Sequence, residues 1–148
     1  MCPSIFIKLL NSLSNLQYLR IYDSTLFNRE RLCRQDKTML KKFLNNNKIN
    51  KITLTTPGDL IEALNILHIF PRIQYFAIQN ISTMNTLIFT YDLFREITQR
   101  GIYHSLTICF FGIGLEESLL NELQKSIYSR GENCQAYRKK ERIYLQWK

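Results

Sequence analysis

Long apolar runs, histidines and paired cysteines are all scarce in this 148-residue sequence. No stretch approaches about 18 uninterrupted apolar residues, so we expect no transmembrane helix. The apolar cluster at residues 5–10 is too short for a secretory signal peptide, and the residues that follow are too polar. The chain is still 45% hydrophobic and 22% charged, which is the composition of an ordinary globular protein and excludes wholesale disorder.

The four cysteines are widely spaced along the chain: Cys2, Cys33, Cys109 and Cys134. None forms a C-x-x-C pair, and His68 and His104 add no ligand set with the spacing of a zinc site, so we predict no metal site. A chain of this length and apolar content does not need a disulfide framework. We therefore expect reduced thiols and a cytoplasmic or nuclear location.

Residue patterns that carry catalysis are also missing. Gly112-Ile-Gly114 lies where a dinucleotide-binding loop would, but Glu117 stands in place of the third glycine. His104 precedes Cys109 by five residues and has the other strand parity, which is too weak a basis for a Cys–His pair. We expect Cys109 to be an inert surface thiol. The chain is predicted to be no enzyme and to bind no cofactor.

What the sequence does contain is an alternation of amphipathic helices with short strands. Apolar residues recur at helical spacing in five segments: 5–13, 36–46, 59–67, 86–99 and 115–127. In the first of them, the stripe predicted to be buried consists of Ile5, Phe6, Leu9, Leu10 and Leu13. Asp36 and Asp59 are predicted N-caps, whereas Gly101 and Gly131 are predicted helix ends.

Five alternating runs predict strands, at residues 18–22, 51–55, 75–79, 105–109 and 142–147. Strands that alternate with helices indicate an α/β fold whose parallel strands are joined by helical crossovers. The last run has two interpretations. It is either a further parallel strand or the second strand of a terminal hairpin with residues 135–138, turning at Lys139-Lys140-Glu141. We favour the hairpin.

Aligned on their strands, four segments share apolar residues at positions 1, 4 and 6. They read Leu16-Leu19-Ile21, Ile49-Ile52-Leu54, Ile73-Phe76-Ile78 and Tyr103-Leu106-Ile108, and their starts are 33, 24 and 30 residues apart. Such self-similarity is typical of a solenoid, in which each unit buries its apolar face against its neighbours. A compact α/β sandwich with coincidental strand patterns is the alternative.

Residues 16–26 read L-Q-Y-L-R-I-Y-D-S-T-L and match L-x-x-L-x-L-x-x-N-x-L, with Ser24 at the Asn position. On this match the chain resembles leucine-rich repeat proteins of the ribonuclease-inhibitor and F-box-receptor type. Pro57, Ile81 and Phe111 stand at the Asn position of the other units, so the polar ladder of the family is not expected. The resemblance implies a short solenoid of about four to five units over residues 1–148. No F-box is visible, and both a short complete protein and a piece of a longer receptor stay open.

The resemblance also implies a binding surface, because leucine-rich repeats present the strand residues between their conserved apolar positions on a concave face. The candidate partner-binding residues are Tyr18, Arg20, Tyr22, Lys51, Thr53, Tyr75, Gln79 and Thr107. Tyrosine and arginine are enriched at protein-binding hot spots. We predict a protein partner, and the resemblance extends this to substrate recognition for a ubiquitin ligase if an F-box lies outside this chain.

The charge supports an alternative function. The formal net charge is +8 and is unevenly placed: residues 20–51 carry +6, residues 59–132 carry −3 and residues 133–148 carry +4. A basic cluster attracts phosphate backbones, so the alternative is a nucleic-acid-binding protein that uses the 20–51 cluster. No sequence motif of a known nucleic-acid-binding fold supports it.

Overall fold

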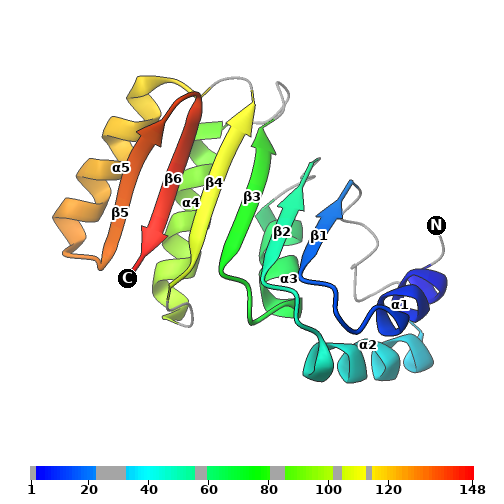
Figure 1. Ribbon diagram of the computed structural model, residues 1–148. Helices are drawn as coiled ribbons and strands as arrows, with labels where there is room; N and C mark the ends of the chain where they lie inside the picture. Colours follow the sequence, from blue (N-terminus) through cyan, green and yellow to red (C-terminus); the bar gives the residue numbers. More distant parts are fainter. Residues whose placement is uncertain (1–2, 23–32, 56–59, 81–85, 102–104, 113–114) are drawn as a thin grey trace.

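A computed structural model describes residues 3–22, 33–55, 60–80, 86–101, 105–112 and 115–148 (Figure 1). These residues form a single open sheet with helices on one side of it and at one end. In chain order the elements are α1 (Pro3–Ser12), β1 (Tyr18–Ile21), α2 (Arg34–Asn46), β2 (Lys51–Leu54), α3 (Leu60–Ile69), β3 (Tyr75–Asn80), α4 (Thr86–Arg100), β4 (Thr107–Gly112), α5 (Glu117–Arg130), β5 (Cys134–Lys139) and β6 (Arg142–Trp147).

The strand order of the sheet is β1-β2-β3-β4-β6-β5. The first four strands are parallel and follow one another in sequence order, so each helical crossover advances the sheet by one strand. β6 pairs antiparallel with both β4 and β5. The α/β prediction is therefore confirmed, and so is the terminal hairpin, whereas a parallel arrangement holds for β1–β4 only.

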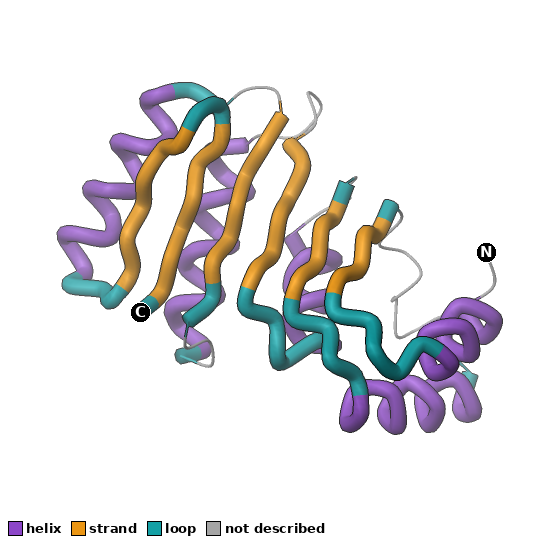
Figure 2. Tube along the Cα trace, viewed as in Figure 1, coloured by secondary structure: helices purple, strands orange, loops and turns teal. Residues whose placement is uncertain are grey.

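The helices leave one face of the sheet uncovered. Figure 1 shows α3, α4 and α5 behind the strands and no described helix in front of them. The tube in Figure 2 shows α1 and α2 side by side at the end of the molecule nearest β1. Side chains of the strands that face the helices form the core, among them Ile52, Phe76, Ile108 and Leu145, which are fully buried.

Aromatic contacts tie the helices and the terminal hairpin into one core. Phe94 of α4, which is fully buried, stacks on Trp147 of β6 with ring centroids 6.0 Å apart. At the other end of the sheet, Phe43 of α2 meets Phe70 edge to face at 6.1 Å. Arg138 links β5 to the start of α5, since its guanidinium donates to Glu117 Oε2 at 3.0 Å and to the Leu115 carbonyl at 2.7 Å.

The observed helix ends agree only partly with those predicted from the sequence. Gly131 follows α5 in the left-handed conformation, and Gly101 after α4 also has a positive φ of 59°, as predicted. Asp36 is not the N-cap of α2. The helix begins earlier, at Arg34, and Cys33 is the cap, while Asp36 accepts from the Cys33 backbone N–H as the third residue of a capping box. This hydrogen bonding lowers the pKa of Asp36, with Cys33 the main contributor. Asp59 lies outside the described residues.

The first helix buries only part of the predicted stripe, since Leu10 is buried and Phe6 packs against the core. Ile7 and Leu10 are buried, whereas Ile5, Leu9 and Leu13 are 61%, 50% and 44% exposed. The apolar arc of α1 is too wide to face the core completely, because Ile7 extends it toward α2. The helix is rotated so that Ile7 and Leu10 reach the core, and the far edge of the arc is left in solvent.

The fourth strand is shifted by two residues from the predicted alignment. Phe76 pairs in register with Ile108 and not with Leu106, so corresponding positions recur every 33, 24 and 32 residues. Ser105, which the alignment placed at the first exposed strand position, has a positive φ of 64° and precedes β4. A two-residue shift preserves the alternation of side chains between the faces. The predicted face of each residue in β4 is therefore unaffected.

Candidate functional site

The candidate partner-binding residues share the uncovered face of the sheet, which we call the open face. Tyr18, Lys51, Tyr75 and Thr107 are successive neighbours in register across β1–β4. Arg20 and Thr53 are paired two residues further along β1 and β2. Residues paired in register point to the same side of a sheet, so the sequence placed these side chains on one face correctly.

A hollow of about 300 Å³ lies in the open face. Its lining comes from five strands: Tyr18, Arg20, Lys51, Thr53, Tyr75, Ala77, Phe111 and Arg142. We call it the strand hollow. Three of its lining residues are cations from three different strands, and Ala77 and Thr53 form a nearly buried floor between them. The arrangement brings positive charge and aromatic surface to one point of the sheet.

Contacts within the open face hold several of these side chains in place. The Tyr18 hydroxyl lies 3.2 Å from Thr53 Oγ1 and bridges β1 and β2. The Arg20 guanidinium lies over the Tyr22 ring at 5.1 Å, and that of Arg142 over the Phe111 ring at 5.4 Å. Such cation–π contacts orient the guanidinium while its outer N–H groups remain available to donate.

The described strands give the open face no acidic side chain. None of the six described strands contains an Asp or Glu, so the cations of the strand hollow have no carboxylate neighbour on the sheet. Lys139, the register partner of Arg142, adds a further cation at the hairpin end of the face. Positive charges concentrated on one surface attract an anionic ligand and repel a cationic one.

Next to the strand hollow, Cys109 is enclosed by Tyr75 and Tyr144. Cys109 lies on the open face, as the alternation predicted, but it is fully buried, so the expectation of a surface thiol is wrong. Burial raises the pKa of the Tyr75 hydroxyl, and the hydrogen bond with Cys109 raises it further. Burial also raises the pKa of Tyr144. Both phenols therefore stay neutral at physiological pH and are polar but uncharged parts of the surface.

Five of the eight predicted residues line the strand hollow, and three do not. Gln79 and Thr107 lie on the open face outside it. Tyr22, which follows β1, is 63% exposed. Phe111 and Arg142 were not predicted as site residues. The alternation of β6 placed Arg142 outward, but only the pairing of β6 with β4 brings it beside the parallel strands. Arg29 and Arg31 of the 20–51 cluster lie outside the described residues.

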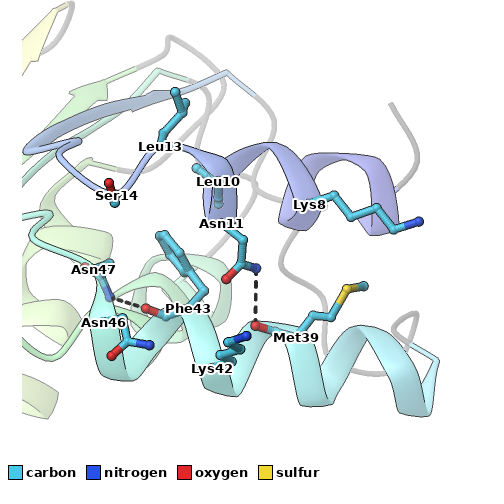
Figure 3. Close-up of a pocket in the computed structure, with 10 residues that line it drawn as sticks. All are labelled: Lys8, Leu10, Asn11, Leu13, Ser14, Met39, Lys42, Phe43, Asn46 and Asn47. Carbon is cyan, nitrogen blue, oxygen red and sulfur yellow. Dashed lines mark hydrogen bonds between the residues drawn. The ribbon is translucent and has the colours of Figure 1, made fainter.

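A second hollow, of about 440 Å³, lies between α1 and α2 (Figure 3). Its lining is Lys8, Leu10, Asn11, Leu13, Ser14, Met39, Lys42, Phe43, Asn46 and Asn47. We call it the α1–α2 groove. Asn11 Nδ2 donates across it to the Met39 carbonyl at 3.4 Å, and Asn47 Nδ2 donates to the Phe43 carbonyl at 3.2 Å. Both lysines are exposed.

Among the described residues, no group of three or more His, Cys, Asp or Glu side chains could hold a metal ion. None of the described helices has the length and apolar content needed to cross a bilayer. Comparison with protein-family models, curated proteins and solved structures found no match to this chain.

The described cysteines differ in their predicted reactivity. Cys33 is exposed, whereas Cys109 is fully buried and burial raises the pKa of Cys134 to about 12. In a Cys2→Ser background at neutral pH, we expect iodoacetamide to modify Cys33 at least about 100-fold faster than the other two, because the thiolate is the reactive form. Mass spectrometry of quenched time points measures the rates, and urea should equalise them. Equal modification of Cys109 and Cys33 in the folded protein would contradict the burial of Cys109.

Proposed function

We propose that this chain is a non-enzymatic protein-interaction module that binds an acidic segment of a partner protein on its open face. The observation that carries this proposal is the strand hollow, where Arg20, Lys51 and Arg142 converge on a sheet whose strands contain no carboxylate. A partner that presents Asp or Glu side chains supplies the missing charge. Complementary charge speeds association and selects against basic partners.

The aromatic residues of the open face support a protein partner. Tyr18 is 50% exposed, so its ring offers apolar contact area while its hydroxyl is already oriented toward Thr53. The guanidinium of Arg20 is oriented by the Tyr22 ring. Side chains that are ordered before binding lose less conformational entropy when a partner arrives. Large aromatic and arginine side chains of this kind dominate the binding energy of protein interfaces.

We further propose that β1–β4 and their helices are a short leucine-rich repeat array that the terminal hairpin closes. Two features support this. The four parallel strands stand in sequence order, and the described helices leave one face of the sheet uncovered. In addition, the residue before each of β1, β2 and β3 accepts a backbone hydrogen bond from the first amide of the neighbouring strand. The accepting carbonyls are those of Gln17, Asn50 and Gln74. In this proposal the location is cytoplasmic or nuclear. A ubiquitin-ligase role, as substrate receptor, additionally requires an F-box outside these residues.

Nucleic acid is the second candidate ligand, because cations and an exposed aromatic ring also suit a single strand. The observation that favours it is the pairing of Arg20 and Lys51 with Tyr18 around one hollow. Binding of this kind weakens steeply with salt. A filter-binding assay with single-stranded RNA and DNA at low salt tests it, and failure of both to bind removes the candidate.

Site-specific photocrosslinking tests the protein-binding proposal. A photoreactive phenylalanine analogue replaces Tyr18 on the open face or, in the control, Tyr128 on α5, which is 91% exposed on the helical side. The two variants are irradiated in cell extract at equal concentration, and the adducts are identified by mass spectrometry. We expect protein adducts from position 18 that position 128 does not give and that excess polyglutamate suppresses. Identical adducts from both positions would contradict the proposal.

A further inference from the structure

We propose that the α1–α2 groove is a second docking site and that it takes an acidic amphipathic helix of a protein partner. The groove is at the helical end of the molecule beside β1 and shares no lining residue with the strand hollow (Figures 1 and 3). This inference does not depend on the open face, and each can fail without the other.

The floor of the groove consists of buried apolar side chains. Leu10 and Phe43 are almost completely buried beneath it, and Met39 leaves part of its surface in the opening, while the Leu13 side chain points away from α2 (Figure 3). Asn47 offers a ligand no unpaired polar group, because its side chain already donates to the carbonyls of Phe43 and Leu44 and accepts from the Ile49 amide. A ligand in the groove therefore meets mainly hydrocarbon at its centre.

The other exposed apolar side chains of α1 lie away from the groove. Ile5 and Leu9 are exposed on the side of the helix opposite Asn11, which reaches across the groove to Met39, and neither lines the groove. The ten residues of α1 span about 15 Å. A groove of this length with an apolar floor between two helices suits a helical segment with an apolar face, which is an established mode of peptide recognition.

Charge selects the kind of helix. The described residues between positions 3 and 55 include eight Lys or Arg residues and one acidic residue, Asp36. That carboxylate is buried and occupied with the Cys33 amide. Lys8 and Lys42 flank the groove, and neither forms an ion pair with a described residue. A helix with Glu or Asp beside its apolar face would match both features.

The same charge disfavours two other occupants. A second copy of this chain would bring its own basic α1 and α2 against these lysines, and like charges at an interface cost several kcal/mol. A nucleic acid would match the lysines but would leave Met39 and the apolar floor of the groove against phosphates. The acidic amphipathic helix is the one occupant that satisfies both the apolar floor and the cationic rim.

The test uses a synthetic fluorescent peptide of Leu and Glu with its leucines at helical spacing. A scrambled peptide of the same composition and a Leu/Lys peptide with the charge reversed are the controls. Fluorescence anisotropy measures affinity for the full chain. We expect binding of the acidic amphipathic peptide only, with Lys8→Glu/Lys42→Glu reducing its affinity at least about tenfold. The neutral pair Lys8→Gln/Lys42→Gln should give a smaller loss. Lys125→Glu/Arg130→Glu on α5 makes the same change in net charge and should alter affinity less than about twofold.

Three results would overturn the inference. Equal binding of the scrambled peptide would show attraction by charge without a groove. Unchanged affinity of the Lys8/Lys42 variant would place the peptide elsewhere, and reversal of the strand-hollow cations would show whether that place is the open face. Concentration-dependent dimerisation in sedimentation that Met39→Asp abolishes would assign the groove to a second copy.

Discussion

Replacing Phe94 by Ala is expected to lower the free energy of unfolding by about 3–5 kcal/mol, the usual cost of removing a fully buried phenylalanine. The loss is large because Phe94 packs beneath the terminal hairpin, where its ring stacks on Trp147. Trp147 belongs to β6, which lies between β4 and β5. A cavity at this point loosens the contact that holds the hairpin on the helices.

Urea unfolding followed by tryptophan fluorescence measures this cost, since Trp147 is the only tryptophan in the chain. Ile88→Ala on the same helix is the matched control. Ile88 is 57% exposed, so its truncation should cost less than about 1 kcal/mol. A similar cost for both variants would contradict the packing of α4 beneath β6.

Reversing the three cations of the strand hollow is expected to abolish binding of an acidic ligand. In Arg20→Glu/Lys51→Glu/Arg142→Glu, three attractive side chains become three repulsive ones at a single point of the sheet. We expect the affinity for a fluorescent polyglutamate peptide to fall at least about 100-fold, because like-charge pairs at an interface cost several kcal/mol. Fluorescence anisotropy at a fixed ionic strength measures the loss.

The control makes the same change in net charge on the helical side. Arg95→Glu/Lys125→Glu/Arg130→Glu replaces basic side chains of α4 and α5, away from the open face. If attraction depended on net charge alone, both triple variants would lose affinity equally, and the strand hollow would have no special role. Circular dichroism confirms that both remain folded. A loss confined to the strand-hollow variant is the predicted result.

The strands and their faces could be predicted from the sequence because side-chain alternation is local. Leu19, Ile52 and Phe76 fall in register as the repeat pattern predicted. The slip of β4 was not visible, since Leu106 and Ile108 are both apolar and have the same parity. The contribution of Arg142 to the strand hollow could not be predicted either, because it depends on which strand the hairpin pairs with.

Burial within the helices was harder to predict than the helices themselves. In α3, helical spacing groups Leu60, Ile61, Leu64 and Leu67 on one apolar side, but Ile61 is 65% exposed and Ile66 is fully buried. Seven of the ten residues of this helix are apolar, so helical spacing alone does not choose a face. The same holds for α1. The core contacts that select the face come from residues distant in sequence.

Chemical-shift mapping tests most directly whether the open face binds an acidic protein segment. The isotope-labelled chain is titrated with an unlabelled polyglutamate peptide, and the backbone amide shifts are followed by NMR. The largest changes are predicted on β1, β2, β3 and β6 around Tyr18, Arg20, Lys51, Tyr75 and Arg142, with α3, α4 and α5 unchanged. Changes confined to the helices, or no saturable change at low salt, would contradict the assignment of the open face as the binding surface.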